Sequence, residues 1–191
     1  MPKNPNPQGK GLAPVMAMLD ESRGASQLAA PKSLNDISVE LFTSLFVLES
    51  DFRFRPVPGN VYWLYRKQDR FRLSPIGPHE WGPRVYGRYV GRCELQQDLT
   101  WTLELGSEAA ADPTLMALIE ERRARFAREL EEAPTLAQAL PGYQQSMPFN
   151  QRMFAYGLAH SLRASLHRSG LAGLSYQQAR AALAAPGHNQ T

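Results

Sequence analysis

The chain has 191 residues, an apolar content of 43% and a charged content of 20%, which are ordinary for a globular protein that buries a core without disulfides or metal. Its single cysteine, Cys93, excludes an intrachain disulfide and favours a reducing, cytoplasmic compartment. No run of about 18 apolar residues is present, so we expect no membrane contact, and the first residues lack the apolar stretch of a secretory signal.

The formal net charge of +3 hides an uneven distribution. Residues 53–92 carry nine Arg or Lys against two acids, a local balance of +7. Residues 1–52 and residues 93–191 each come to −2. A concentrated positive zone on a nearly neutral chain predicts an anionic partner better than the overall charge does.

The chain begins with an extended segment, residues 1–32, that is rich in Pro, Gly and Asn. Within it Val15, Met16 and Leu19 have helical spacing over residues 12–23, which predicts a short helix there. Gly9, Lys10 and Gly11 lack the spacing and the following Ser or Thr of a phosphate-binding loop. We expect residues 33–185 to form a single domain and residues 186–191 to be a frayed tail.

The next predicted element is a helix over residues 34–52. Ser33 is in the position of an N-cap, and Asp36 follows in the first turn, near the positive end of the helix dipole. Apolar residues recur every three or four positions along one face. A helix this apolar is expected at the centre of the core.

Four strands follow, with the sheet core at residues 58–105. Alternation and turn residues predict strands at 61–66 and 71–76, joined by a hairpin turn at 68–69. A second hairpin is predicted from strands at 88–95 and 99–105 around residues 96–98, with Leu99, Trp101, Leu103 and Leu105 on one face. Between the hairpins, prolines and glycines place His79, Glu80 and Trp81 in an irregular loop.

The remainder is predicted to be helical. Asp112 and Pro113 have the N-cap and first-turn pattern of a helix over residues 112–132. A second helix is expected over 150–169, ending at Gly170, and a third, shorter one opens with a capping box of Ser175 and Gln178 and runs to about 185. The predicted fold class is α+β: a small antiparallel sheet of three to four strands packed against an apolar helix, with a helical C-terminal half.

Few residues have the pattern of a catalytic or metal site. His79 and Glu80 have the chemistry for acid–base work in a small enzyme, but the favoured interpretation is structural, with Trp81 in the core, Gly82 at a positive φ and Glu80 capping a turn. His160 and His167 are seven residues apart on one helix, too far for shared ligation. Cys93 is expected to be an inert thiol on the inner sheet face with Tyr89, Gly91 and Leu95. No cofactor or metal is therefore expected.

The functional hypothesis rests on the basic, aromatic sheet. We expect a non-enzymatic binding or interaction module whose contact surface is this sheet together with the loop at residues 75–83, and whose ligand is an acidic protein segment or peptide. Binding of RNA or single-stranded nucleic acid by the same surface is the alternative, with Tyr62, Tyr65, Phe71 and Tyr86 as stacking rings. The predicted binding residues are Tyr62, Tyr65, Arg66, Arg70, Arg72, Glu80, Trp81, Tyr86, Arg88 and Arg92.

Three short motifs also point to a known family. The first is an aromatic strand pattern, the second a Ser-x-I-x-P-x-E-W-G turn, and the third a G-x-x-x-L-x-x-D-x-T-W pattern. This chain resembles the uncharacterised family named domain of unknown function 2452, and the NPNPQGKGL segment and helical tail also look like its bacterial members. The resemblance implies no activity, cofactor or catalytic residue. The residues that carry it are Tyr62, Leu64, Tyr65 and Arg66, then Ser74, Ile76, Pro78, Glu80, Trp81 and Gly82, and then Gly91, Leu95, Asp98, Thr100 and Trp101.

Overall fold

The computed structural model describes residues 32–80, 87–141 and 148–184. The predicted extended segment with its short helix therefore lies outside the described residues, apart from Lys32 at its end. So do the frayed tail and the predicted positions of Trp81, Gly82 and Tyr86.

The apolar helix α2 spans Leu34–Leu48 and forms the centre of the core, as predicted. Ser33 and Asp36 form a reciprocal capping box, in which each side chain accepts a hydrogen bond from the backbone of the other residue. The helix ends four residues earlier than predicted, because the chain there turns to join the sheet edge. The N–H of Asp51 donates to the carbonyl of Phe71 at 2.9 Å, and the N–H of Leu73 donates to the carbonyl of Asp51 at 3.1 Å.

The sheet consists of β1 (Val61–Lys67), β2 (Arg70–Ser74), β3 (Arg88–Leu95) and β4 (Trp101–Leu105), in the order β2-β1-β3-β4 with every pair antiparallel. Both predicted hairpins are present. Gln68 takes a φ of 56° in the first turn and Leu99 a φ of 66° in the second. The left-handed backbone of Leu99 explains why β4 begins two residues later than predicted, and β2 ends before Pro75, which has no N–H to donate.

An irregularity in β3 changes which side chains share a face. Leu64 pairs with Gly91, whereas Tyr65 pairs with Tyr89, so Val90 is an extra residue relative to β1. Cys93, Gly91 and Val90 consequently all lie on the inner, helix-covered side and are buried. The expectation that Tyr89 shares the inner face with Cys93 is therefore wrong, because the bulge turns Tyr89 to the other side.

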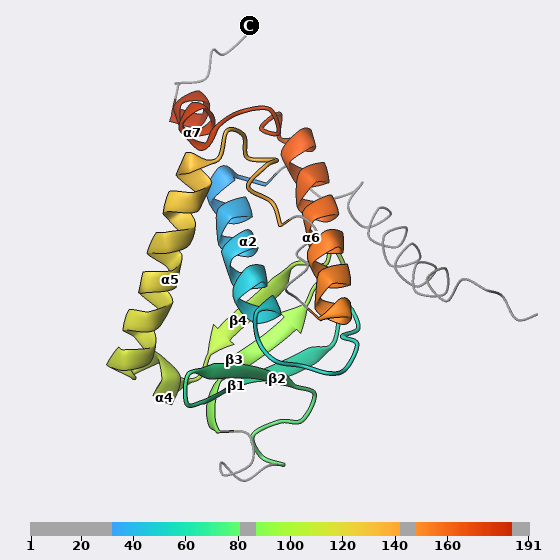
Figure 1. Cartoon of the computed structure of the whole chain (residues 1–191), viewed down its shortest axis with the longest axis vertical. Coiled ribbons are helices and arrows are strands. Elements are labelled where there is room, and N and C mark those ends of the chain that lie inside the picture. The colour runs from blue at the N-terminus through green and yellow to red at the C-terminus, as the bar shows by residue number, and fades with distance from the viewer. Residues whose placement is uncertain (1–31, 81–86, 142–147, 185–191) are drawn as a thin grey trace, which may run out of the picture.

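The remaining described helices are α4 (Ser107–Ala110), α5 (Pro113–Glu132), α6 (Phe149–Arg168) and α7 (Tyr176–Ala184). Their predicted caps are confirmed: Asp112 accepts from the N–H groups of Thr114 and Leu115, Ser175 and Gln178 form a capping box, and Gly170 has a φ of +69°. Figure 1 shows α2, α5 and α6 on one side of the sheet, with α7 at the ends of α5 and α6 that are farthest from it. The predicted α+β fold is confirmed.

The inner side of the sheet meets α2 through rings and one buried hydroxyl. The Phe46 and Phe71 ring centroids lie 4.9 Å apart, and Tyr62 meets Trp101 edge-on at 5.7 Å. The backbone N–H of Trp101 donates to the hydroxyl of Ser44 on α2 at 2.9 Å, and both residues are buried. This hydrogen bond satisfies an amide of the edge strand β4 that would otherwise be buried without a partner.

We expect Gly91→Ala to lower the free energy of unfolding by about 2–3 kcal/mol through overpacking. A Cβ at this position would lie 2.4 Å from the carbonyl oxygen of Glu104 and 2.9 Å from Leu103 Cδ1. Gly173→Ala is the matched control, since nothing lies within 4 Å of its added Cβ. Urea unfolding of the three proteins measures both effects, and equal stability of the two variants would contradict the packing described here.

Candidate binding surface

One face of the sheet is not covered by any helix of the described residues (Figure 1). Strand alternation and the pairing register define which side chains belong to this outer face. It carries both cations and rings, together with two acids. Its members are Val61, Trp63, Tyr65, Lys67, Arg70, Arg72, Ser74, Tyr89, Arg92, Glu94, Thr102 and Glu104.

Three of the rings expected to be open are buried. Tyr62, which is 4% exposed, lies on the inner side, where its hydroxyl accepts from the N–H of Val57 at 2.7 Å. Phe71 is on the inner side as well. Tyr65 is on the outer side but only 3% exposed, and its hydroxyl donates to the carbonyl of Ile76 at 3.0 Å. The expectation that these three rings are open for base stacking is therefore wrong.

The loop after β2 provides this cover on the outer side. A Cβ on Gly77 would lie 3.3 Å from the ring of Trp63, so the loop backbone passes close over that indole. The carboxylate of Glu80 accepts from the N–H of Gly77 at 3.2 Å, and the N–H of Glu80 donates to the carbonyl of Gly77 at 3.1 Å. Glu80 thus caps a turn, as the structural interpretation predicted, and His79 beside it is exposed.

The cations of the outer face remain accessible. Arg92 is 44% exposed and pairs with Glu94 at 3.2 Å and with Glu104 at 4.0 Å. Arg72 is 40% exposed and lies 3.9 Å from Asp51. Arg70 is exposed at the start of β2. Pairs of half-exposed side chains at these distances contribute little to stability, and Nε of Arg72, the atom nearest Asp51, is itself buried without a hydrogen bond.

The predicted binding residues therefore fall into separate groups. Arg70, Arg72 and Arg92 share the outer face. Arg66 and Arg88 are cross-strand neighbours on β1 and β3. Both are on the inner side of the sheet and line a cavity at its end. Tyr62 is in the core and Tyr65 is buried on the outer side beneath the loop. Glu80 caps its loop, and Trp81 and Tyr86 lie outside the described residues.

Two features of the site were missed from the sequence. One is Trp63, a half-buried outer-face ring, and strand alternation relative to Tyr62 was a sufficient signal for it. The other is a partly buried ion cluster, in which Lys32 Nζ lies 2.7 Å from Asp98 and 2.8 Å from Glu40. No local pattern indicates a contact between residues 66 positions apart in the sequence.

Asp98 also folds the turn between β3 and β4. One of its carboxylate oxygens accepts from both the N–H and the hydroxyl of Thr100, at 3.1 and 2.6 Å. Burial would raise the pKa of Asp98, but the hydrogen bonds from Lys32 and Thr100 outweigh it and lower that pKa. Burial raises the pKa of Glu40, and its hydrogen bond from Lys32 offsets only part of the effect. The Asp and Thr of the third motif therefore have a structural role.

The described residues show no catalytic or metal centre of a familiar kind. Cys93 is buried, and this burial raises the pKa of its thiol to about 12. No group of three His, Cys, Asp or Glu within the described ranges is placed to hold a metal ion. None of the described helices is long and apolar enough to cross a membrane.

These features define an α+β protein whose four-stranded antiparallel sheet is helix-covered on one face and basic on the other. Residues 41–117 match the family described as "Protein of unknown function (DUF2452)", which confirms the resemblance. The match extends from the middle of α2 through the sheet to the first turns of α5. No solved structure matches the chain significantly.

We expect Asp98→Asn to lower the free energy of unfolding at neutral pH by about 1–3 kcal/mol, because it removes a charge-assisted hydrogen bond to Lys32. The folded-state pKa of Asp98 lies below its ordinary 3.8, so its stabilisation is present above that pH and is lost as the pH falls through the folded pKa. Urea unfolding at neutral and acidic pH should show the deficit shrink in acid. A deficit that is independent of pH, or as small as that of the exposed control Glu121→Gln, would contradict the ion cluster.

We expect Cys93 to resist thiol reagents in the folded protein. With a thiol pKa of about 12, only about one molecule in ten thousand carries the reactive thiolate at pH 8, and the sulfur is buried as well. Absorbance with a chromogenic disulfide should show a reaction in minutes in concentrated urea and almost none without it. Prompt stoichiometric labelling of the folded protein would place the thiol outside the core.

Proposed function

We propose that this protein is a non-enzymatic binding module that takes an acidic segment of a partner protein on its outer face. The observation that carries the proposal is the placement of charge. Lys67, Arg70, Arg72 and Arg92 occupy the sheet face that none of the described helices covers (Figure 1). Opposite charges on a partner would be steered to that face and held in register there.

The ring content of the face favours a peptide over a nucleic acid. Base stacking needs open ring faces, whereas Tyr65 is buried under the loop and Trp63 and Tyr89 are only half-exposed. Half-exposed rings still offer apolar area to side chains that pack against them from above. Carboxylates interspersed with apolar residues match this mixture of guanidinium groups and ring edges.

The chemistry of the described residues also favours binding over catalysis. Glu80, the carboxylate beside His79, accepts a hydrogen bond from its own loop, and the thiol of Cys93 is buried with a raised pKa. The outer face thus gains its chemistry from charge and shape rather than from an activated group. A reduced, buried thiol also fits the cytoplasmic compartment that we propose for the protein.

The test compares two variants with the same change of charge. Arg70→Glu with Arg72→Gln alters the outer face, whereas Arg125→Glu with Arg128→Gln alters exposed positions on α5. The probes are a labelled peptide that alternates glutamate and leucine, and a labelled oligo(dT). Fluorescence anisotropy should show the outer-face variant binding the peptide about tenfold more weakly than wild type, with the α5 variant nearly unchanged.

The control separates a specific surface from a general charge effect. Equal weakening in both variants would mean that only net charge matters, and the outer face would lose its role. Binding confined to oligo(dT), or failure of the wild-type protein to retain the peptide even at low salt, would replace or remove the proposed ligand.

A further inference from the structure

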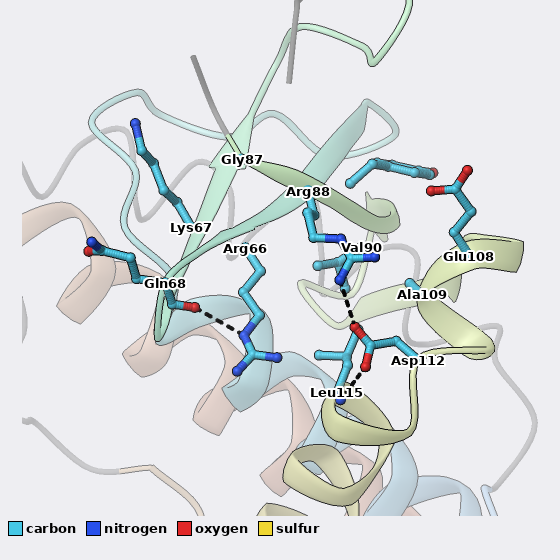
Figure 2. Close-up of a pocket in the computed structure, with 11 residues that line it drawn as sticks. Arg66, Lys67, Gln68, Gly87, Arg88, Val90, Glu108, Ala109, Asp112 and Leu115 are labelled. Atoms are coloured by element: carbon cyan, nitrogen blue, oxygen red, sulfur yellow. Dashed lines mark hydrogen bonds and ion pairs between the residues drawn. The ribbon is translucent and has the colours of Figure 1, made fainter. Parts of the chain in front are cut away.

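A cavity of about 440 Å³ lies at the end of the sheet, where the β1–β2 hairpin, the start of β3 and the α4–α5 turn meet (Figure 2). It is separate from the centre of the outer face, and its size is that of a small-ligand site. Its inner wall is apolar, formed by the buried residues Val90, Ala109 and Leu115. Its charged lining consists of Arg66, Lys67, Arg88, Glu108 and Asp112.

Arg66 is the cation most suited to hold a ligand here. Its side chain is only 20% exposed, so most of it is shielded from water. Its Nε donates to the carbonyl of Gln68 at 3.1 Å, and its ion pair with Asp69 is 3.6 Å long, to a carboxylate that is 99% exposed. A guanidinium has five N–H donors, and these contacts engage few of them. Figure 2 shows Arg66 extending from β1 toward the first turn of α5, beside Leu115.

The amides at the start of α5 are already occupied. Asp112 accepts from the N–H groups of Thr114 and Leu115 at 3.0 and 3.2 Å, so the helix end is capped by the chain itself. The same carboxyl group pairs with Arg88 at 3.1 Å. Asp112 thus lies beside the largely exposed Arg88 at the mouth of the cavity, and a ligand's negative charge would be received by the guanidinium groups rather than by the helix end.

The shape of this end of the sheet depends on Gly87. Its φ is +98°, and a Cβ there would lie 2.3 Å from the carbonyl oxygen of Arg66. Only glycine lets β3 begin this close to the end of β1. The close approach places Arg88 next to Arg66, with which it pairs across the two strands.

We propose that this cavity binds a single carboxylate attached to an apolar group, with Arg66 as its principal contact. The lining has three basic and two acidic side chains, a net formal charge of +1, which suits one negative charge better than the two of a phosphate ester. The planar guanidinium fork matches a carboxylate, and the apolar wall matches a hydrocarbon substituent. The carboxylate belongs either to a small carboxylic acid or to the C-terminal residue of a peptide.

The test uses the full chain and two-dimensional amide NMR. N-acetyl-leucine should shift the amide signals of Gly87, Tyr89 and Leu115 in a saturable way, whereas N-acetyl-leucinamide and isobutyl phosphate should not. A short peptide ending in leucine with a free carboxylate is the second ligand. Tighter binding of the peptide would assign the chain end as the natural group, and tighter binding of N-acetyl-leucine would assign a small acid.

Two cavity variants, with one control on the outer face, test the contact itself. Arg66→Gln should weaken N-acetyl-leucine binding about tenfold, the loss typical of one charge-assisted contact, while Arg70→Gln, the same change on the outer face, should leave it unchanged. Glu108→Gln, at an exposed position, should strengthen binding and serves as the test should Arg66→Gln fail to fold. Absence of any shift, equal binding of the amide, or no response to either Arg66→Gln or Glu108→Gln would overturn the proposal.

The proposal for the outer face and the proposal for the cavity can be refuted independently of each other. Loss of acidic-peptide binding in the outer-face variant leaves the cavity intact, because neither Arg70 nor Arg72 lines it. Loss of N-acetyl-leucine binding in Arg66→Gln likewise leaves Arg70, Arg72 and Arg92 in place on the outer face.

Discussion

A β-sheet with helices on one side has a second face that must meet either water or a loop. In this protein α2 lies against the inner face and buries Phe71 and Trp101 with its own Phe46 and Ser44. The rest of the described structure follows from that one-sided cover (Figure 1). Most of the large apolar side chains of the strands point to the inner side, and the alternate positions, which include Arg70, Arg72 and Arg92, point outward.

The outer face resolves this constraint with a loop rather than a second layer of helices. The chain after β2 passes over Trp63 and accepts the hydroxyl of Tyr65 at the carbonyl of Ile76. Glu80 holds the loop in shape by accepting from Gly77. The loop buries Tyr65 and covers part of Trp63, while the arginines around them stay exposed, because a guanidinium group on a flexible stem reaches past its neighbours. The accessible part of the outer face is consequently more basic than aromatic.

Much of the fold could be predicted because its signals are local. The caps at Ser33, Asp112 and Ser175 are set by residues within one turn, and each is present. Strand alternation was equally local, but it failed at one point, where the bulge at Val90 sends Tyr89 to the outer side. A bulge depends on how two strands pair, and its cause lies in the partner strand as much as in β3 itself.

The candidate site was less predictable, because exposure is decided by parts of the chain that are distant in sequence. Tyr62 and Tyr65 have similar sequence surroundings in the same strand. Tyr62 is nevertheless buried against Trp101, whereas Tyr65 is buried beneath the loop. The exposure of the basic residues is likewise decided by distant parts of the chain. Arg122 on α5 lies over the rings of Phe46 and Phe71 at 5.5 and 5.3 Å and pairs with Glu49 at 3.2 Å. Its charge is used to pack α5 on the core, whereas the charge of Arg70 faces water. A charge count identifies a positive segment, but only the packing shows which cations are held inside the fold and which face water, and our two proposals therefore rest on the arginines of the outer face and on Arg66 at the end of the sheet.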